Sequence, residues 1–126
     1  MFRSKWILGP DAGFAGEVLV SVTEFTLDDF RHTPGAYRAG FALSREWPRL
    51  AGAVGLWLWA EPSRRRLGSV SVWRDRESMR GFVGLPAHVA IMRKYRRLGA
   101  ARATTWHSGE PDQRLLWQAA GQWLRE

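Results

Sequence analysis

The chain of 126 residues has the length of one domain, enough to bury about two-thirds of its unfolded surface. It contains no cysteine, which excludes disulfides, a thiolate nucleophile and a cysteine-based metal site. The net charge of +7 favours an anionic ligand or partner, although a solvated basic surface has the same composition. No apolar run reaches the roughly 18 residues that a membrane span requires.

Residues 1–16 contain Gly9, Pro10 and Gly13, which predict a loop or arm with a short extended piece at Trp6–Leu8. The hydrophobic stretch in this arm is too short for the core of a signal peptide, so we expect a cytoplasmic protein with no membrane partner. The alternating sequence at Glu17–Phe25 predicts a strand with both faces at least partly covered.

A helix is expected from about Ala36 to Trp47, after the break at Pro34 and Gly35. Its apolar residues recur at helical spacing, and Pro48 should end it. A β-hairpin follows over residues 51–73. Along its second strand Ser69, Ser71 and Trp73 share one face, and small polar side chains beside an indole fit the lining of a cavity better than a tight core.

Asp75 is a suitable N-cap for the next helix, which should be interrupted near Gly84 and begin again at Pro86. The renewed helix carries His88 on the same face as Ile91, Met92 and Tyr95, and we expect this face to point toward the sheet. It should stop at Leu98 and Gly99.

A last strand over Ala101–His107 and a terminal helix capped by Asp112 complete the order β-α-β-β-α-β plus one helix. This order predicts a single α+β domain with a ferredoxin-like four-stranded antiparallel sheet and both helices on one side. The domain divides into an arm at 1–16, the core at 17–107 and a C-terminal helix at 111–126. The other sheet face should be open in a monomer, so a second copy is expected to cover it.

His88 is the leading candidate for chemistry, because a neutral imidazole exchanges protons near pH 7. The alternatives are a structural histidine hydrogen-bonded to backbone, or a haem or metal ligand; we predict no metal, because no second ligand clusters with His88 in the sequence. No Ser-His-Asp triad is identifiable. The predicted substrate-binding residues come from the strands and helices just described: Trp73, Ser69, Ser71, Tyr37, Trp59, Met92 and Tyr95.

The densest basic cluster comprises Arg93, Lys94, Arg96 and Arg97, which suits a carboxylate or phosphate. Neither aromatic residues at motif spacing nor a recognition-helix pattern accompanies this cluster, so nucleic-acid binding is not favoured.

Two segments together resemble the dimeric α+β barrel superfamily. The segment GSVSVWRDRESMRGFVGLPAHVAIMRKYRRLG (68–99) has that superfamily's strand ending in S-x-W, acidic turn, helix with an aromatic residue, and histidine followed by bases. The segment ALSREWPRLAGAVGLWLWAEP (42–62) stands where the superfamily has its helix and second strand. The resemblance extends from about Glu17 to His107, and the most similar groups are antibiotic biosynthesis monooxygenase-like proteins and a bacterial family of spheroidene monooxygenase-like proteins.

This resemblance implies a bacterial homodimer whose two sheets form a barrel, with a pocket between helices and sheet in each subunit. It implies a cofactor-independent monooxygenase or isomerase of secondary metabolism, acting on a hydrophobic aromatic or polyketide-like molecule with His88 handling the proton. The alternatives are a non-catalytic ligand-binding dimer and a haem-binding protein with His88 as the axial ligand. The superfamily's haem degraders use a Trp, a His and an Asn, and this sequence contains no Asn, which disfavours haem degradation.

Overall fold

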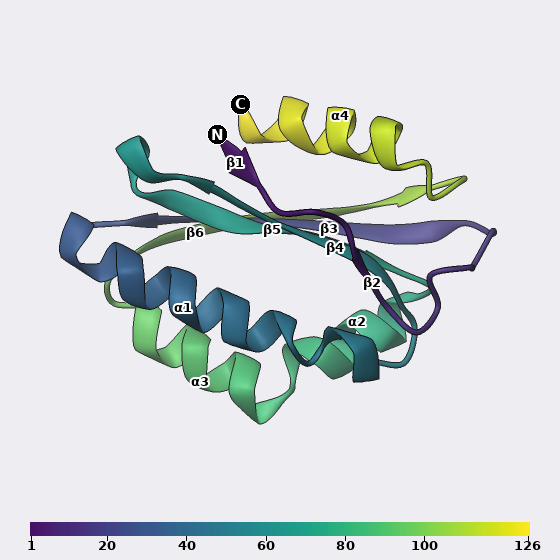
Figure 1. The fold of residues 1–126 in the computed structure, drawn as a ribbon, viewed down its shortest axis with the longest axis horizontal. Helices are drawn as coiled ribbons and strands as arrows, with labels where there is room; N and C mark the ends of the chain where they lie inside the picture. The colour runs from purple at the N-terminus through teal and green to yellow at the C-terminus, as the bar shows by residue number, and fades with distance from the viewer.

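The computed structural model describes all residues, 1–126, as an antiparallel sheet with helices on both faces (Figure 1). The strand order is β1-β4-β5-β3-β6, and β2 pairs with β4 beside β1. The strands are β1 (Phe2–Arg3), β2 (Ile7–Leu8), β3 (Val18–Leu27), β4 (Ala53–Glu61), β5 (Arg66–Trp73) and β6 (Gly99–Ser108). The α-helices are α1 (Thr33–Ser44), α2 (Arg76–Val83), α3 (Pro86–Tyr95) and α4 (Gln113–Leu124), and short 3₁₀ turns lie at Phe30–His32, Trp47–Arg49 and Pro62–Arg64.

This arrangement confirms the predicted α+β, ferredoxin-like order with an extra C-terminal helix. The interruption near Gly84 is confirmed as well: α2 is capped by the Asp75 side chain, which accepts from the Ser78 N–H at 2.8 Å, and α3 begins at Pro86. None of the helices combines the length and apolarity needed to cross a bilayer.

The predicted bounds of α1 were wrong at both ends. The helix starts at Thr33, because Pro34 lies in its first turn, where proline lacks no hydrogen bond that the helix needs. It ends at Ser44, and Trp47 belongs to the following 3₁₀ turn. Gly35 of α1 lies close to α3, since a Cβ at this position would stand 3.0 Å from the Tyr95 hydroxyl.

The N-terminal arm covers one edge of the sheet. Both β1 and β2 pair with β4, whereas the sequence predicted only the extended piece around Ile7. The Trp6 ring packs on the Trp57 ring at a centroid distance of 4.4 Å, over Gly55, where any Cβ would overlap the indole.

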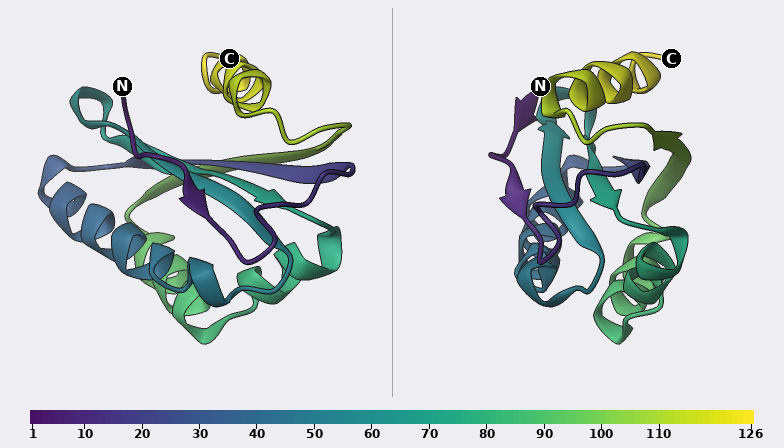
Figure 2. Two further views of the ribbon diagram at one scale, coloured as in Figure 1. Left: turned by 45° about the vertical axis from the view of Figure 1, so that its right-hand side comes forward. Right: turned by 90° about the vertical axis from the view of Figure 1, so that its right-hand side faces the viewer.

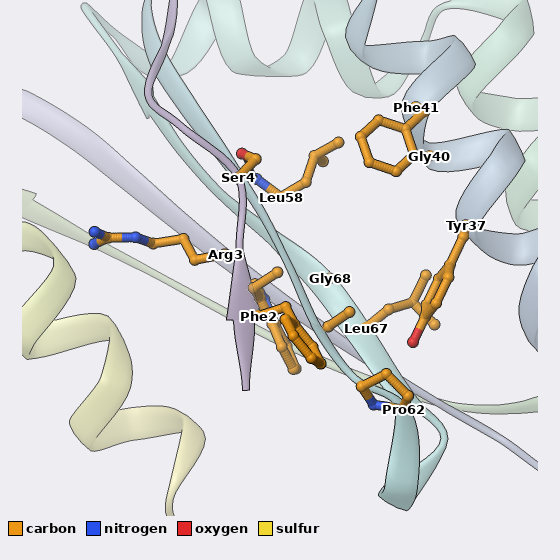
Figure 3. A pocket seen from close by; sticks show the side chains of 12 residues that line it. Phe2, Arg3, Ser4, Tyr37, Gly40, Phe41, Leu58, Pro62, Leu67 and Gly68 are labelled. Atoms are coloured by element: carbon orange, nitrogen blue, oxygen red, sulfur yellow. Dashed lines mark hydrogen bonds between the residues drawn. The ribbon is translucent and has the colours of Figure 1, made fainter.

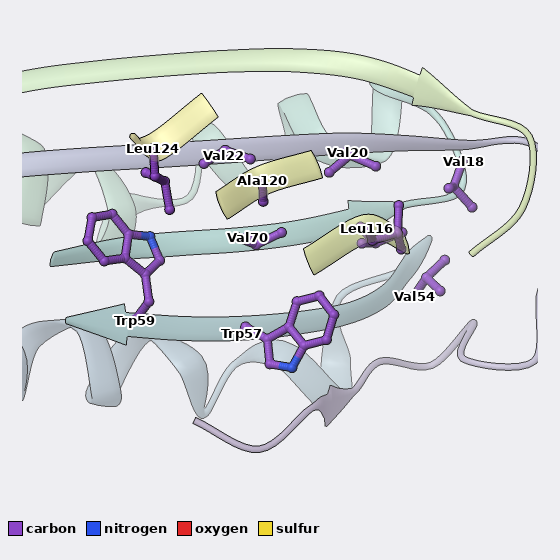
Figure 4. Close-up of a cluster of buried hydrophobic side chains, with 11 residues drawn as sticks. Val18, Val20, Val22, Val54, Trp57, Trp59, Val70, Leu116, Ala120 and Leu124 are labelled. Carbon is purple, nitrogen blue, oxygen red and sulfur yellow. The ribbon is translucent and has the colours of Figure 1, made fainter. Parts of the chain in front are cut away.

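The two sheet faces carry different helices, as the views in Figure 2 show: α1, α2 and α3 lie under one face and α4 lies over the other. The α4 face buries a cluster centred on Val20, Val22, Val70 and Val72, all fully inaccessible, with Leu116 inserted from the helix (Figure 4). The prediction that this face is open in a monomer was therefore wrong. No second copy is needed to cover it, because this chain's own α4 does so.

Charged groups hold the end of α4 on the sheet. The Arg66 guanidinium donates to the Leu124 carbonyl at 2.8 Å, and Arg102 donates to the Trp123 carbonyl at 3.3 Å. Both guanidinium groups also pair with Glu24. Burial alone would raise the pKa of Glu24, but the hydrogen bonds and charges of Arg102 and Arg66 outweigh it and lower that pKa below its ordinary value.

Candidate functional site

On the sheet face that carries α1, α2 and α3 (the helix layer), a polar patch divides the core in two. One apolar cluster contains Leu19 and Trp73, and the other contains Leu27 and Tyr95. Between them, on the same face of the paired strands β3 and β5, Ser21 lies opposite Ser71 and Thr23 lies opposite Ser69. We call these four residues (Ser21, Thr23, Ser69 and Ser71) the polar floor.

Hydrogen bonds link the side chains of the polar floor. The Thr23 and Ser69 hydroxyls are 2.9 Å apart, and the Trp73 indole N–H donates to the Ser71 hydroxyl at 3.0 Å. Thr23 is exposed even though it lies in the middle of a strand flanked on both sides. The helices therefore do not seal this part of the face, and a ligand can reach the hydroxyl groups.

An aromatic cluster stands at one end of the polar floor. The Trp47 ring packs edge-on against Trp73 at 4.8 Å, and Phe82 lies 5.5 Å from Trp73. His88 extends this cluster, since its ring packs against Phe82 at a centroid distance of 5.0 Å. A continuous series of contacts thus connects His88, through Phe82 and Trp73, to Ser71.

Several buried polar atoms of the helix layer have no hydrogen-bond partner in the protein. They include the Trp47 indole nitrogen, the Tyr37 hydroxyl, the Thr33 hydroxyl and Nδ1 of His88. Buried polar groups are nearly always hydrogen-bonded, so unpaired ones need a reason. Two of them have a position that gives one: Trp47 packs on Trp73 at the end of the polar floor, and Tyr37 lines the cavity described next.

A cavity of about 330 Å³ opens beside α1, near the lower limit for small-molecule sites. Tyr37 reaches into it from α1 toward Leu67, and Phe41 and Leu58 form further walls (Figure 3). The lining is almost entirely apolar because the guanidinium of Arg3 turns away and stacks on Trp117, 4.6 Å from the ring centre. This cavity suits a hydrophobic ligand.

The predicted substrate-binding residues do not all converge. Ser69, Ser71 and Trp73 lie together on the sheet face that carries α1, α2 and α3, and Tyr37 reaches the cavity beside them. Trp59 contributes to the cavity wall, but it belongs to the cluster under α4, and its indole N–H donates to the Thr23 carbonyl at 3.2 Å.

The three predicted site residues of α3 also lie in different surroundings. Tyr95 is buried against Leu27 and Ala36, in the cluster beyond the polar floor. Met92 is 43% exposed, so the expectation that it points toward the sheet was wrong. His88 is half-buried and belongs to the aromatic cluster.

Sequence analysis missed Ser21, Thr23, Trp47 and Phe82. The two β3 residues carried a signal, because polar side chains interrupt an otherwise apolar face between Leu19 and Phe25. No group of three or more His, Cys, Asp or Glu residues is placed to hold a metal ion.

The imidazole of His88 is expected to titrate below its ordinary pKa near 6.5, because burial of the ring disfavours the charged form more than the nearby backbone of Val83 favours it. The neutral ring therefore predominates at pH 7. Since the unfolded chain binds this proton more readily, the contribution of His88 to stability falls as the pH drops below about 6.5. NMR titration of the histidine Cε1 protons, assigned with His88→Gln, checks this; a value at or above 6.5 contradicts it.

Comparison with known proteins finds relatives only at the level of structure. No family model matches the chain, and neither does any curated protein sequence. Protein SO0527 from Shewanella oneidensis superposes with a TM-score of 0.67 at 18% identity, over 75% of this chain and 94% of that one. A protein from Nitrosomonas europaea, provisionally assigned as an antibiotic biosynthesis monooxygenase, gives 0.65 at 11% identity, over 79% and 96%.

A variant of SnoaB, described as a cofactor-independent oxygenase from Streptomyces nogalater, superposes with a TM-score of 0.59 at 17% identity, over 71% of this chain and 90% of that one. These identities carry the fold and not the activity. The structure and the comparisons together show that this chain has the α+β fold of the antibiotic biosynthesis monooxygenase-like proteins.

Proposed function

We propose that the protein binds a hydrophobic aromatic or polyketide-like molecule between its helix layer and its sheet, and that it acts as a cofactor-independent monooxygenase or isomerase. The observation that carries this proposal is His88: a half-buried imidazole, neutral at pH 7, whose buried Nδ1 has no partner in the protein. The description of SnoaB as a cofactor-independent oxygenase supports the oxygenase form.

In the oxygenase form, His88 takes a proton from an acidic methylene group of the substrate. The resulting enolate supplies the electrons that reduce dioxygen. The methylene becomes a carbonyl, one oxygen atom enters the product, and the other leaves as water with the two hydrogens. In the isomerase form, His88 returns the proton to a different carbon of the same substrate.

The other groups of the site hold the ring system. The rings of Trp47, Trp73 and Phe82 offer flat contact surfaces beside His88, and the apolar cavity, which Tyr37 lines and His88 does not, takes a second part of the molecule. The Tyr37 hydroxyl and Trp47 indole N–H have no partner in the protein and are proposed to donate to a substrate carbonyl. Concentrating negative charge on that oxygen favours loss of the neighbouring proton.

The same site supports a second proposal, a protein that binds such a ligand without reacting with it, because the unpaired donors recognise a carbonyl whether or not a proton moves. We further propose a cytoplasmic homodimer for either function. The unpaired outer edge of β6 is available for this contact, whereas α4 already occupies the sheet face.

The test is oxygen consumption with an anthrone-like substrate, followed in parallel with quenching of tryptophan fluorescence. Uptake of one dioxygen per quinone formed supports the oxygenase, and quenching without turnover of an anthrone or an isomerisable lactone supports the binding protein. A protein that neither quenches nor turns over such compounds overturns both proposals. Haem titration is the control: a Soret band lost in His88→Ala would assign the site to haem instead.

A further inference from the structure

The positive charge of the molecule is concentrated on one side. Residues 74–98, which contain α2 and α3, carry seven basic and two acidic residues, whereas 110–126, which contain α4, carry two basic and three acidic residues. Because α2 and α3 lie on the opposite side of the sheet from α4, this difference separates two faces of the molecule (Figures 1 and 2). The helix layer is the basic face.

The bases of this layer lie on the outward sides of its helices. In α1 and at its C-cap, Arg38, Ala42 and Arg45 are exposed at helical spacing. In α3 and its end, Ala90, Arg93, Lys94 and Arg97 are exposed in the same way. None of these bases forms an ion pair, so their charge is not neutralised within the protein.

Exposed apolar side chains accompany these bases on all three helices. Phe41 in α1 is 57% exposed, Val83 in α2 is 46% exposed, and Met92 in α3 is 43% exposed. The outward positions between these basic residues, Ala42 and Ala90, are alanines. Alanine offers no side-chain hydrogen bond to the sugar or nucleobase of a nucleic acid. Bases mixed with large apolar groups suit the interface of an anionic bilayer, where phosphates meet acyl chains.

We propose that the outer face of α1, α2 and α3 binds the surface of a membrane rich in anionic lipids. The sequence predicts no membrane partner because it contains no span. The structure adds the grouping of charge and apolar side chains on one face, which peripheral binding requires. Phe41 also lines the cavity beside α1, so this face and the ligand cavity meet at one residue. The proposal does not depend on catalysis.

The experiment is sedimentation of the full chain with vesicles of phosphatidylcholine alone or mixed with phosphatidylglycerol, at low and high salt. The protein is expected to bind only the mixed vesicles and to dissociate as salt increases. Substituting glutamine at Arg93, Lys94, Arg96 and Arg97 should weaken binding by about tenfold or more. Phe41→Ser should weaken it by roughly threefold, through loss of apolar insertion.

The α4 side provides matched controls. Arg114→Gln with Arg125→Gln removes charge from the opposite face, and Leu115→Ser removes an apolar side chain that is 54% exposed there. These variants should bind as the unchanged protein does. Absence of binding to mixed vesicles overturns the proposal, and so does equal loss in the α4 variants. Retention of duplex DNA without vesicle binding, at the same salt, would assign the face to nucleic acid.

Discussion

Replacing His88 by glutamine is expected to lower turnover of an anthrone-like substrate by about 10²–10⁴-fold, the usual contribution of a general base. Glutamine has a similar size and retains hydrogen bonding, but it accepts no proton near pH 7. The packing against Phe82 at 5.0 Å survives in part, so the variant should fold. Thermal unfolding measured beside the activity separates loss of chemistry from loss of structure.

The matched control for this variant is His107→Gln. His107 lies on edge strand β6, 55% exposed, with only a 3.5 Å contact to Glu17, and its replacement should leave turnover unchanged. The activity of the unchanged protein should also decline on acidification, because protonation of His88 removes the base; its lowered pKa extends the active range to lower pH. A folded His88→Gln protein that keeps turnover within about threefold would exclude general-base catalysis by this residue.

Replacing Leu116 by alanine is expected to lower the free energy of unfolding by about 3 kcal/mol, within the range for a leucine removed from a packed core. Leu116 is 2% exposed and projects from α4 into the cluster of Val20, Val22, Val70 and Val72. A loss of this size is a large part of the stability of a typical domain. Urea denaturation measures it directly.

Leu115→Ala is the control for Leu116, since the neighbouring side chain is 54% exposed and its loss should change stability by no more than about 0.5 kcal/mol. The two variants have the same change in composition and helix propensity, so their difference reports the packing of α4 alone. Equal stability of both variants would mean that α4 does not rest on the sheet as described.

The sequence predicted the elements well because hydrophobic period and capping residues are local signals. Asp75, Gly84 and Pro86 define the ends of α2 and α3 through their own backbone and side-chain preferences, and the structure has those ends. The first helix was harder to bound, because Pro34 either breaks a helix or begins one, depending on its position in the first turn.

The site was predictable only in part, because strand register and sheet faces are not local properties. The alternation places Ser69, Ser71 and Trp73 on one face, but it does not reveal that Ser21 and Thr23 stand opposite them. Trp59 alternates with Leu58, and both faces of this sheet are apolar. The pattern therefore does not show which of the two faces α4 and which faces α1, α2 and α3. The docking of α4 depends on contacts with β3, β4 and β5, which are distant from it in the sequence.

The N-terminal arm limits how copies of this protein can pair through their sheet edges. The two edges of the sheet are unequal: β4 is covered by the short strands β1 and β2, while β6 presents ten residues with an unpaired outer edge. The unpaired N–H and C=O groups of such an edge form hydrogen bonds with a strand of another chain, and a sheet with two such edges adds further copies at both ends. If β6 of one copy pairs with β6 of another, as in the homodimer proposed above, only the covered edges remain outside. Association through strands is then expected to end at two molecules rather than to extend into a fibre.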